Sequence, residues 1–541
     1  MNLRLVPRKW KTAALLLTVV LASCGGSAAP ASSPSAASAG APTASSASSA
    51  SQAASGSASA SSGRELRVIM GANQGTLDPF AVATEQEMLV TRNVYDSLLR
   101  YKPNSSQLEG DLATSWSASP DGLQYTFHLR PGVTWQKGYG AFTAADVKAS
   151  YDYLLDPANK QPFRTVVNMI KSVSVVDPMI VMFTLKAPYV PFLQLMTDYR
   201  VGPIVNVKAI KAEGANWIWQ PVGTGPYMLQ SAHPRVDATL VANPGYWGPP
   251  PTIKTIYMKT ITDDNAAVAA MENKQFDLWD GRAADSTVVK HMASEGFVQT
   301  AVNRHVPLVL LMNLTVKPFD NLKVRQAIAY SVNRQQIIDL GLQGDATPWY
   351  NPVPKGYIDV NPNVPHFDTD INKAKALLAQ AGYPNGVSVT LNVYQGPVQQ
   401  PSNVLQEQLK QSGIKVTQQL LDQPTFIKDV FTNKNIDFAL HCCQRQPDPD
   451  LILSDMFSAK NRGAIYISHI DLEAQLAQAR QELDPQKRQQ DYYKLETQII
   501  NDVDMIPIAM TPAFLTSQPD LKGMPSSESI WGLDWTQFSF K

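Results

Sequence analysis

The sequence has few of the residues from which metal centres and hydrolytic active sites are built. Its 541 residues include seven histidines and three cysteines, and no two histidines are closer than 14 positions. A helix-borne pair of zinc-binding histidines four residues apart is therefore excluded, and no Gly-x-Ser-x-Gly nucleophile elbow is present. Basic and acidic residues balance at 46 each, so no basic field indicates nucleic-acid binding. No repeat of fixed period indicates a solenoid.

The sequence also lacks an N-terminal apolar run long enough to span a membrane. Thr12–Ala22 is uncharged and mostly apolar, but it is shorter than the roughly 20 residues that a spanning helix needs. It follows four basic residues and ends in Leu-Ala-Ser-Cys at residues 21–24. A plain secretory signal needs no cysteine there. The segment resembles a bacterial lipoprotein box, which implies a signal peptide over residues 1–23 and lipidation of Cys24. The alternative is a cytosolic leader with a chance cysteine.

Residues 25–63 contain only Ala, Ser, Gly, Pro, Thr and one Gln. With no charge and no large apolar side chain, this segment cannot bury enough surface to offset its chain entropy, and we expect it to be disordered. As a flexible coil its ends would lie roughly 35 Å apart. Residues 24–63 are therefore predicted to tether a folded body above a membrane.

From Arg64 onward the pattern alternates strands with helices, which is typical of an α/β protein. Tyr125–Leu129 and Val387–Val393 have strand patterns, and a helix is predicted after Thr143. Another helix is expected after Asp370, ending before Gly382, because Asp favours N-caps and Gly favours the position after a helix. A chain of this length is expected to form two or three lobes.

Nine short motifs follow one another along the folded part, and most consist of turn and packing residues. They are residues 76–79 (TLDP), 93–99 (NVYDSLL), 111–116 (DLATSW), 125–133 (YTFHLRPGV), 142–147 (FTAADV), 222–227 (VGTGPY), 243–248 (NPGYWG), 318–320 with 324–327 (PFD, VRQA) and 374–382 (AKALLAQAG). In this order they resemble the extracellular solute-binding proteins of the peptide, dipeptide and nickel importer family, over nearly all of residues 64–541.

The resemblance implies a periplasmic-binding-protein-like α/β fold, with two hinged lobes that close on a solute and one additional domain. Domain I would comprise residues 64–105, 222–318 and 508–541, domain II residues 106–221, and domain III residues 319–507. The implied partners are an ABC permease and its ATPase subunits. The protein would act outside the cytoplasm as a lipid-anchored monomer, without a cofactor or a structural metal and without catalysis.

The sharpest prediction concerns the segment from His441 to Asp450 (HCCQRQPDPD). In peptide-binding members of the family, an aspartate three residues before an Asp-Pro pair holds the ammonium group of the peptide. Here the pair begins at Asp448, and the position three residues earlier is Arg445. A guanidinium would repel an ammonium and suit a carboxylate or phosphate, so a peptide bound amine-first is not the expected ligand. Alternatively, Arg445 pairs with a neighbouring aspartate such as Asp448.

Further ligand-binding candidates are polar or aromatic residues at predicted strand ends and in loops, where amides and aromatic rings suit a polar, partly flat solute. Together with the segment above, the predicted ligand-binding residues are Asn73, Gln74, Asn313, Trp349, Tyr394, Gln395, Gln444, Arg445 and Asp448. For most of these, packing is the competing interpretation. The adjacent Cys442 and Cys443 are expected to be buried thiols, with a soft-metal site as the alternative.

The sequence thus predicts a substrate-binding lipoprotein of an ABC importer that captures a peptide-like or other polar solute. One alternative is a member of the same family that binds an oligosaccharide or a metal chelate. The other is a secreted hydrolase, which the missing nucleophile and metal constellations disfavour.

Overall fold

The computed structural model describes residues 63–71, 75–82, 85–103, 105, 107–281, 286–433, 435–442, 447–458, 472–525 and 533–541. All of them belong to one compact unit, residues 62–541. The predicted signal peptide, Cys24 and the tether lie outside the described residues and stay predictions. Within those ranges, no helix combines the length and the apolar character that crossing a membrane requires.

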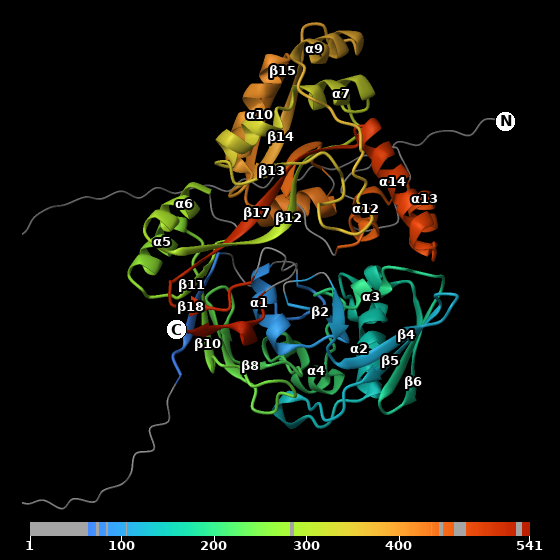
Figure 1. Cartoon of the computed structure of the whole chain (residues 1–541), viewed down its shortest axis with the longest axis vertical. Coiled ribbons are helices and arrows are strands. Elements are labelled where there is room, and N and C mark those ends of the chain that lie inside the picture. The colour runs from blue at the N-terminus through green and yellow to red at the C-terminus, as the bar shows by residue number, and fades with distance from the viewer. Residues whose placement is uncertain are drawn as a thin grey trace, which may run out of the picture. The chain divides into compact units, whose positions relative to one another are not determined.

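A large mixed sheet runs through this unit (Figure 1), and over the described ranges it has eleven strands. Its order is β15 (Ile414–Leu421), β14 (Val387–Tyr394), β16 (Phe438–Cys442), β12 (Val298–Met312), β17 (Met505–Ser517), β11 (Leu278–Asp280), β1 (Leu66–Met70), β10 (Thr255–Thr260), β9 (Asp237–Ala242) and β8 (Tyr227–His233), with β13 (Thr347–Pro348) paired to β17.

The two longest strands of this sheet connect its two halves. β12 and β17 pair antiparallel from Val298 opposite Ser517 to Leu311 opposite Met505, with register shifts on the way. One end of this pair adjoins β11, and the other end adjoins β16. The two strands therefore form a continuous backbone connection between the β1 side and the β14 side of the sheet.

A separate antiparallel sheet has the order β4 (Ala113–Ala118), β5 (Gln124–Leu129), β7 (Ile180–Leu185) and β6 (Ile170–Asp177). Buried residues alternate with less buried ones along β5 and β7, as in a sheet with one face on a core. The helix predicted after Thr143 is confirmed as α2 (Ala144–Leu155), and the carboxylate of Asp146 accepts a hydrogen bond from Thr143 N at 2.9 Å.

The remaining elements are short helices and strand pairs around these sheets. The helices are α1 (Glu85–Val94), α3 (Phe192–Leu195), α4 (Val207–Glu213), α5 (Asp264–Glu272), α6 (Ser286–Ser294), α7 (Leu322–Ser331), α8 (Arg334–Gln336), α9 (Ile371–Gln380), α10 (Gln399–Gln411), α11 (Gln423–Lys428), α12 (Pro449–Phe457), α13 (Glu473–Gln481) and α14 (Pro485–Asn501). The strand pairs are β2 (Leu99–Tyr101) with β3 (Leu108–Gly110), and β18 (Leu521–Lys522) with β19 (Ser539–Phe540).

Among the described residues, buried apolar side chains form three clusters. The first joins residues 66–258 to parts of β11, β12 and the C-terminal segment, and the third is a small cluster around α5 and α6. The second spans residues 308–509, which is close to the predicted domain III. One core thus covers the ranges predicted for the first part of domain I and for domain II, and the boundary between these two domains stays a prediction.

One buried acid in the second cluster predicts a pH-dependent stability. Glu496 Oε2 accepts hydrogen bonds from Asn351 Nδ2 (2.6 Å) and Asn361 N (2.8 Å). Burial raises the pKa of Glu496 from its ordinary 4.5 to about 8. The folded state therefore favours the protonated acid, and this contribution to stability is present below pH 4.5 and is lost as the pH rises to about 8.

We expect the free energy of unfolding to fall between pH 5 and pH 8, and we expect Glu496→Gln to reduce that fall. Urea unfolding at both pH values measures the difference. Glu407→Gln is the matched control, because the Glu407 side chain is 68% exposed. An unchanged pH dependence in Glu496→Gln would show that this acid does not contribute.

Candidate solute-binding site

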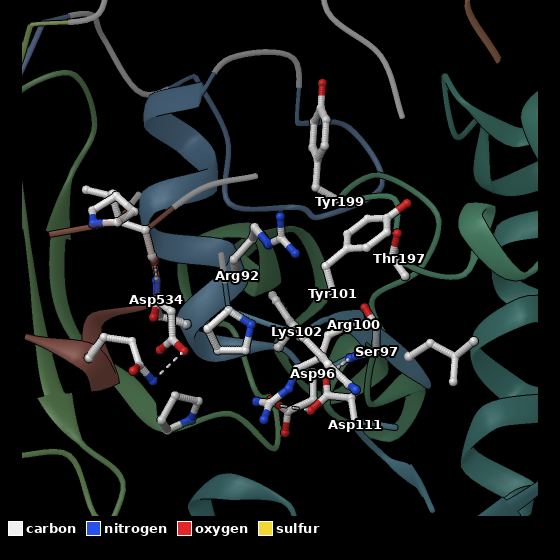
Figure 2. A pocket seen from close by; sticks show the side chains of 18 of the residues that line it. Arg92, Asp96, Ser97, Arg100, Tyr101, Lys102, Asp111, Thr197, Tyr199 and Asp534 are labelled. Carbon is white, nitrogen blue, oxygen red and sulfur yellow. Dashed lines mark hydrogen bonds and ion pairs between the residues drawn. The ribbon is translucent and has the colours of Figure 1, made fainter. Parts of the chain in front are cut away.

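A cavity of about 260 Å³ lies beside the end of α1. It is lined by residues of α1, by residues 95–105 including β2, by Asp111, by the segment 197–203, by residues 523–525 and 533–538, and by Pro226 and Tyr246. Figure 2 shows side chains from several of these segments converging on one space. Segments separated by more than 400 residues in the chain therefore build one concave surface, which is how solute sites are commonly formed.

Four of the sequence motifs meet at the floor of this cavity. Asp96, from residues 93–99, accepts hydrogen bonds on Oδ2 from Thr224 Oγ1 and from Trp247 Nε1, each at 2.9 Å. Asp111 accepts one from Ser97 N at 3.0 Å. The motifs were predicted to be packing residues, and they do pack. Their packing also fixes the shape and polarity of the cavity floor.

The charges of the floor are largely balanced among themselves. The pKa of Asp111 is raised to about 8, mainly by burial and also by the nearby charge of Asp96, against the opposing effect of Arg100. Arg100 Nε donates to Glu109 Oε1 at 2.8 Å, and its Nη1 lies 3.9 Å from Asp111 Oδ1. Arg100 is thus committed to the floor rather than to the open cavity.

The predicted contact residue Asp448 lies at the start of α12 and is not among the residues that line the cavity. Burial is the main cause that raises the pKa of Tyr101, a residue of the cavity lining, and the charge of Asp448 adds to this rise. Asp448 itself is fully buried, and its Oδ1 and Oδ2 accept from Arg488 Nη2 at 2.8 and 2.7 Å. It also caps α12 by accepting from Asp450 N at 2.8 Å. The carboxylate of Asp448 is thus engaged within the fold, and its contact with a solute stays a prediction.

Tyr394 and Gln395 lie at the C-terminal end of β14, and Cys442 ends the adjacent β16. The ring of Tyr394 is buried against Phe426, with centroids 4.9 Å apart, and next to His441, at 6.0 Å. Gln395 is exposed. Tyr394 therefore supports the core at this edge of the sheet, whereas Gln395 remains available to a solute.

Cys442 is a free, half-buried cysteine, and the burial of its thiol raises the pKa to about 12. A thiol protonated at neutral pH is a poor metal ligand, because metals bind the thiolate. The part of the chain that the structure describes holds no group of three or more His, Cys, Asp or Glu arranged for a metal ion. Cys443 lies outside that part.

Asn313 is not brought together with the residues at the end of β14. β12 runs antiparallel to β16, so Asn313 follows Met312 at the end where β16 begins. There its Nδ2 donates to Asp437 Oδ1 at 3.0 Å. Trp349 is half-buried, and its Nε1 donates to Val353 O at 3.1 Å. Each of these two side chains thus has a hydrogen-bond partner within the fold.

Four of the predicted contact residues, Asn73, Gln74, Gln444 and Arg445, lie outside the described residues. The interpretation of Arg445 as an anion-binding residue, and its alternative as a partner of Asp448, both stay predictions. Asp448 has a different partner in the structure, which is Arg488.

The cavity contains polar residues that the sequence did not single out. These are Arg92, Tyr101, Lys102, Thr197, Tyr199 and Asp534. One local signal pointed to Arg92: it is the single basic residue of α1, and it directly precedes the motif at residues 93–99. A lone cation on a helix whose neighbours are buried is unusual enough to indicate a role.

Residues 107–464 match the family described as bacterial extracellular solute-binding proteins, family 5 middle. The chain belongs to this family, which confirms the membership that the order of the motifs predicted. It is therefore a solute-binding protein of the kind that serves ABC importers outside the cytoplasm, and the predicted class of fold and function is confirmed.

Two curated relatives are glutathione-binding proteins GsiB. The protein of Escherichia coli O1:K1 / APEC is 28% identical over 502 residues, and that of Salmonella paratyphi A is 29% identical over 504 residues. Each alignment covers 89% of this chain and 94% of the relative.

Solved structures share the fold over most of the chain. DppA from Helicobacter pylori, in complex with the peptide STSA, is 25% identical with a TM-score of 0.79 over 88% of this chain and 98% of that one. MoaA from A. tumefacien R10, in complex with mannopinic acid, is 27% identical with a TM-score of 0.79 over 88% and 100%. NikA from Brucella suis, in complex with Fe(III)-EDTA, is 24% identical with a TM-score of 0.80 over 88% and 100%.

Proposed function

We propose that this chain captures a small peptide-like or other polar solute in the cavity beside α1 and delivers it to an ABC permease with its ATPase subunits. A lipid on Cys24 would hold it at the outer face of the membrane, as a monomer. The observation that carries this proposal is the polar cavity of about 260 Å³ floored by four of the family's motifs. Typical ligand pockets hold about 300–1,000 Å³, so the size favours a small solute over a long peptide.

A second observation supports a closing movement. Tyr189, next to α3, donates through Oη to Asp450 Oδ2 of α12 at 3.1 Å, and Val190 N donates to Arg480 O of α13 at 2.9 Å. Figure 1 shows α3 facing α12 and α13. Residues 106–221 and the second apolar core are thus joined here by a side-chain hydrogen bond and a backbone hydrogen bond. Contacts of this kind would form on closure around a solute.

Glutathione is the first solute to test, because the curated relatives are named for binding it. We expect calorimetric titration to give one site per chain, and the bound solute to be recovered chemically unchanged, since the proposed role involves no turnover. Preferential binding of an oligosaccharide or of Fe(III)-EDTA would instead select an alternative ligand within the family. Conversion of a bound solute into a product would contradict the proposal.

The prediction for Arg445 has its own test. We expect that acetylating the amine of a bound peptide leaves its affinity nearly unchanged, because a guanidinium at this position does not attract an ammonium group. Titration of glutathione and of the peptide STSA, each with a free and an acetylated amine, measures the effect. Binding of the free-amine form that acetylation abolishes would refute the prediction.

A further inference from the structure

Arg92 lies in the last turn of α1 and lines the cavity. Its Nη1 is fully buried and has no hydrogen-bond partner within the described part of the chain. A guanidinium carries five N–H donors, and buried donors in native proteins are almost always paired. An unpaired one in a cavity wall therefore points to a partner that is not part of the fold.

The nearby carboxylates do not supply this partner. Asp111, Asp198 and Asp534 attract Arg92 from a distance, but none of them forms an ion pair with it in the described ranges. Asp198 Oδ2 is bound by Arg200 Nη2 at 3.0 Å, and Asp534 Oδ1 accepts from Thr536 N at 2.9 Å.

Burial outweighs the attraction of these carboxylates, so the pKa of Arg92 is lowered from its ordinary value. The fold therefore holds a cation that its own residues do not fully compensate. This arrangement is typical of functional sites, where a ligand completes the set of contacts.

The surroundings of Arg92 suit an acidic group. Figure 2 shows Arg92 between Asp534 and Tyr101, with Tyr199 and Lys102 also on the wall of the cavity. Lys102 Nζ makes one long hydrogen bond, 3.4 Å to Gln107 Oε1, at an exposed position. The cavity thus offers a buried guanidinium and a more exposed ammonium.

We propose that Arg92 determines the specificity of the cavity by binding a carboxylate of the solute, with Lys102 adding a second positive charge. A guanidinium binds a carboxylate with two parallel hydrogen bonds. A singly charged carboxylate fits better than a doubly charged phosphate, because three protein carboxylates lie within electrostatic range of Arg92. This inference rests on the proposed function and adds a class of solute to it, namely acids.

The test uses the full chain, purified in a mild detergent, and matched pairs of probes. The acids are glutathione, the peptide STSA and succinate, and each is compared with a counterpart whose carboxylates are amidated. Wild type, Arg92→Met, Arg92→Lys and the control Arg67→Gln are titrated by calorimetry. Arg67 is a suitable control because its side chain is 53% exposed and lies outside the cavity lining.

For wild type we expect at least one acid to bind about 30-fold more tightly than its amide, the scale of losing one partner of a buried, hydrogen-bonded charge pair. Arg92→Met is expected to weaken binding of the acid by a similar factor and to leave binding of the amide nearly unchanged. Arg92→Lys should recover part of the affinity, and Arg67→Gln all of it. Inorganic phosphate should bind more weakly than the acid.

The melting temperature measured without solute distinguishes a binding role of Arg92 from a structural role. Because burial disfavours the charge, Arg92→Met should melt at the wild-type temperature or above it, whereas a structural role would lower the melting temperature. The proposal is overturned if Arg92→Met unfolds, if it binds acids as well as wild type does, or if amides bind wild type as tightly as acids. Tight binding of neutral probes alone would overturn this inference and leave the proposed function standing. Failure of every probe, acidic or neutral, would count against both.

Discussion

Arg480→Met is expected to weaken solute binding about 30-fold while the chain stays folded. Arg480 Nε donates to Asp450 Oδ1 at 3.0 Å, and Asp450 also accepts from Tyr189 across the contact between α12 and α3. Without Arg480, the buried carboxylate of Asp450 lacks its counter-charge in the closed form, in which Tyr189 covers it. In an open arrangement, water would solvate this carboxylate. The substitution therefore penalises the closed form, and apparent affinity falls in proportion to the closed population.

Calorimetry with a solute that binds wild type measures this loss. Tyr189→Phe is the milder companion, because it removes one hydrogen bond and leaves the ion pair; about a threefold to tenfold loss is expected. Lys410→Met, on the exposed pair with Glu407, is the control and should bind like wild type. Equal affinities for Arg480→Met and wild type would mean that this contact does not take part in closure.

Arg488→Met is expected to lower the free energy of unfolding by about 3–5 kcal/mol, the range for breaking a buried ion pair by removing one partner. Arg488 binds both oxygens of Asp448 and also pairs with Asp359. The Asp448 carboxylate is fully buried, and the variant would leave it without a counter-charge. Burial already raises the pKa of Asp448 to about 6 despite Arg488, so protonation would absorb part of the loss at low pH.

Urea unfolding at neutral pH measures this change, and Lys494→Met on the same helix is the control. The Lys494 side chain is 76% exposed in its pair with Asp491, so its loss should change the stability by about 1 kcal/mol or less. If the two variants were equally stable, the Arg488–Asp448 pair would not be what holds the start of α12.

The sequence predicted best those features that short segments determine. Asp370 marked the start of α9, where its side chain accepts a hydrogen bond from Lys373 N. Gly382 marked the end of α9, and it has a positive φ of 92°. The order of the motifs was sufficient for the family, because each motif records a turn or a packing contact of the fold.

Features that depend on distant partners were predicted less completely. The long pairing of β12 with β17, from Val298 to Leu311, was not predicted, because it joins segments that are far apart in the chain. The same limit applies to Asp448, whose partner within the fold was not predicted. Its neighbours in the sequence suggested contact with a solute, whereas its ion-pair partner Arg488 lies 40 residues further on. Arg92 was missed because its significance depends on residues such as Asp534, at the other end of the chain.

The measurement that tests the central claim most directly is native mass spectrometry of the full chain with the acidic probes and their amides together. The account predicts one acidic solute per chain, bound with unchanged mass, and the loss of that adduct in Arg92→Met but not in Arg67→Gln. A chain that binds none of the solutes, or a spectrum in which product masses replace the probes, would contradict it.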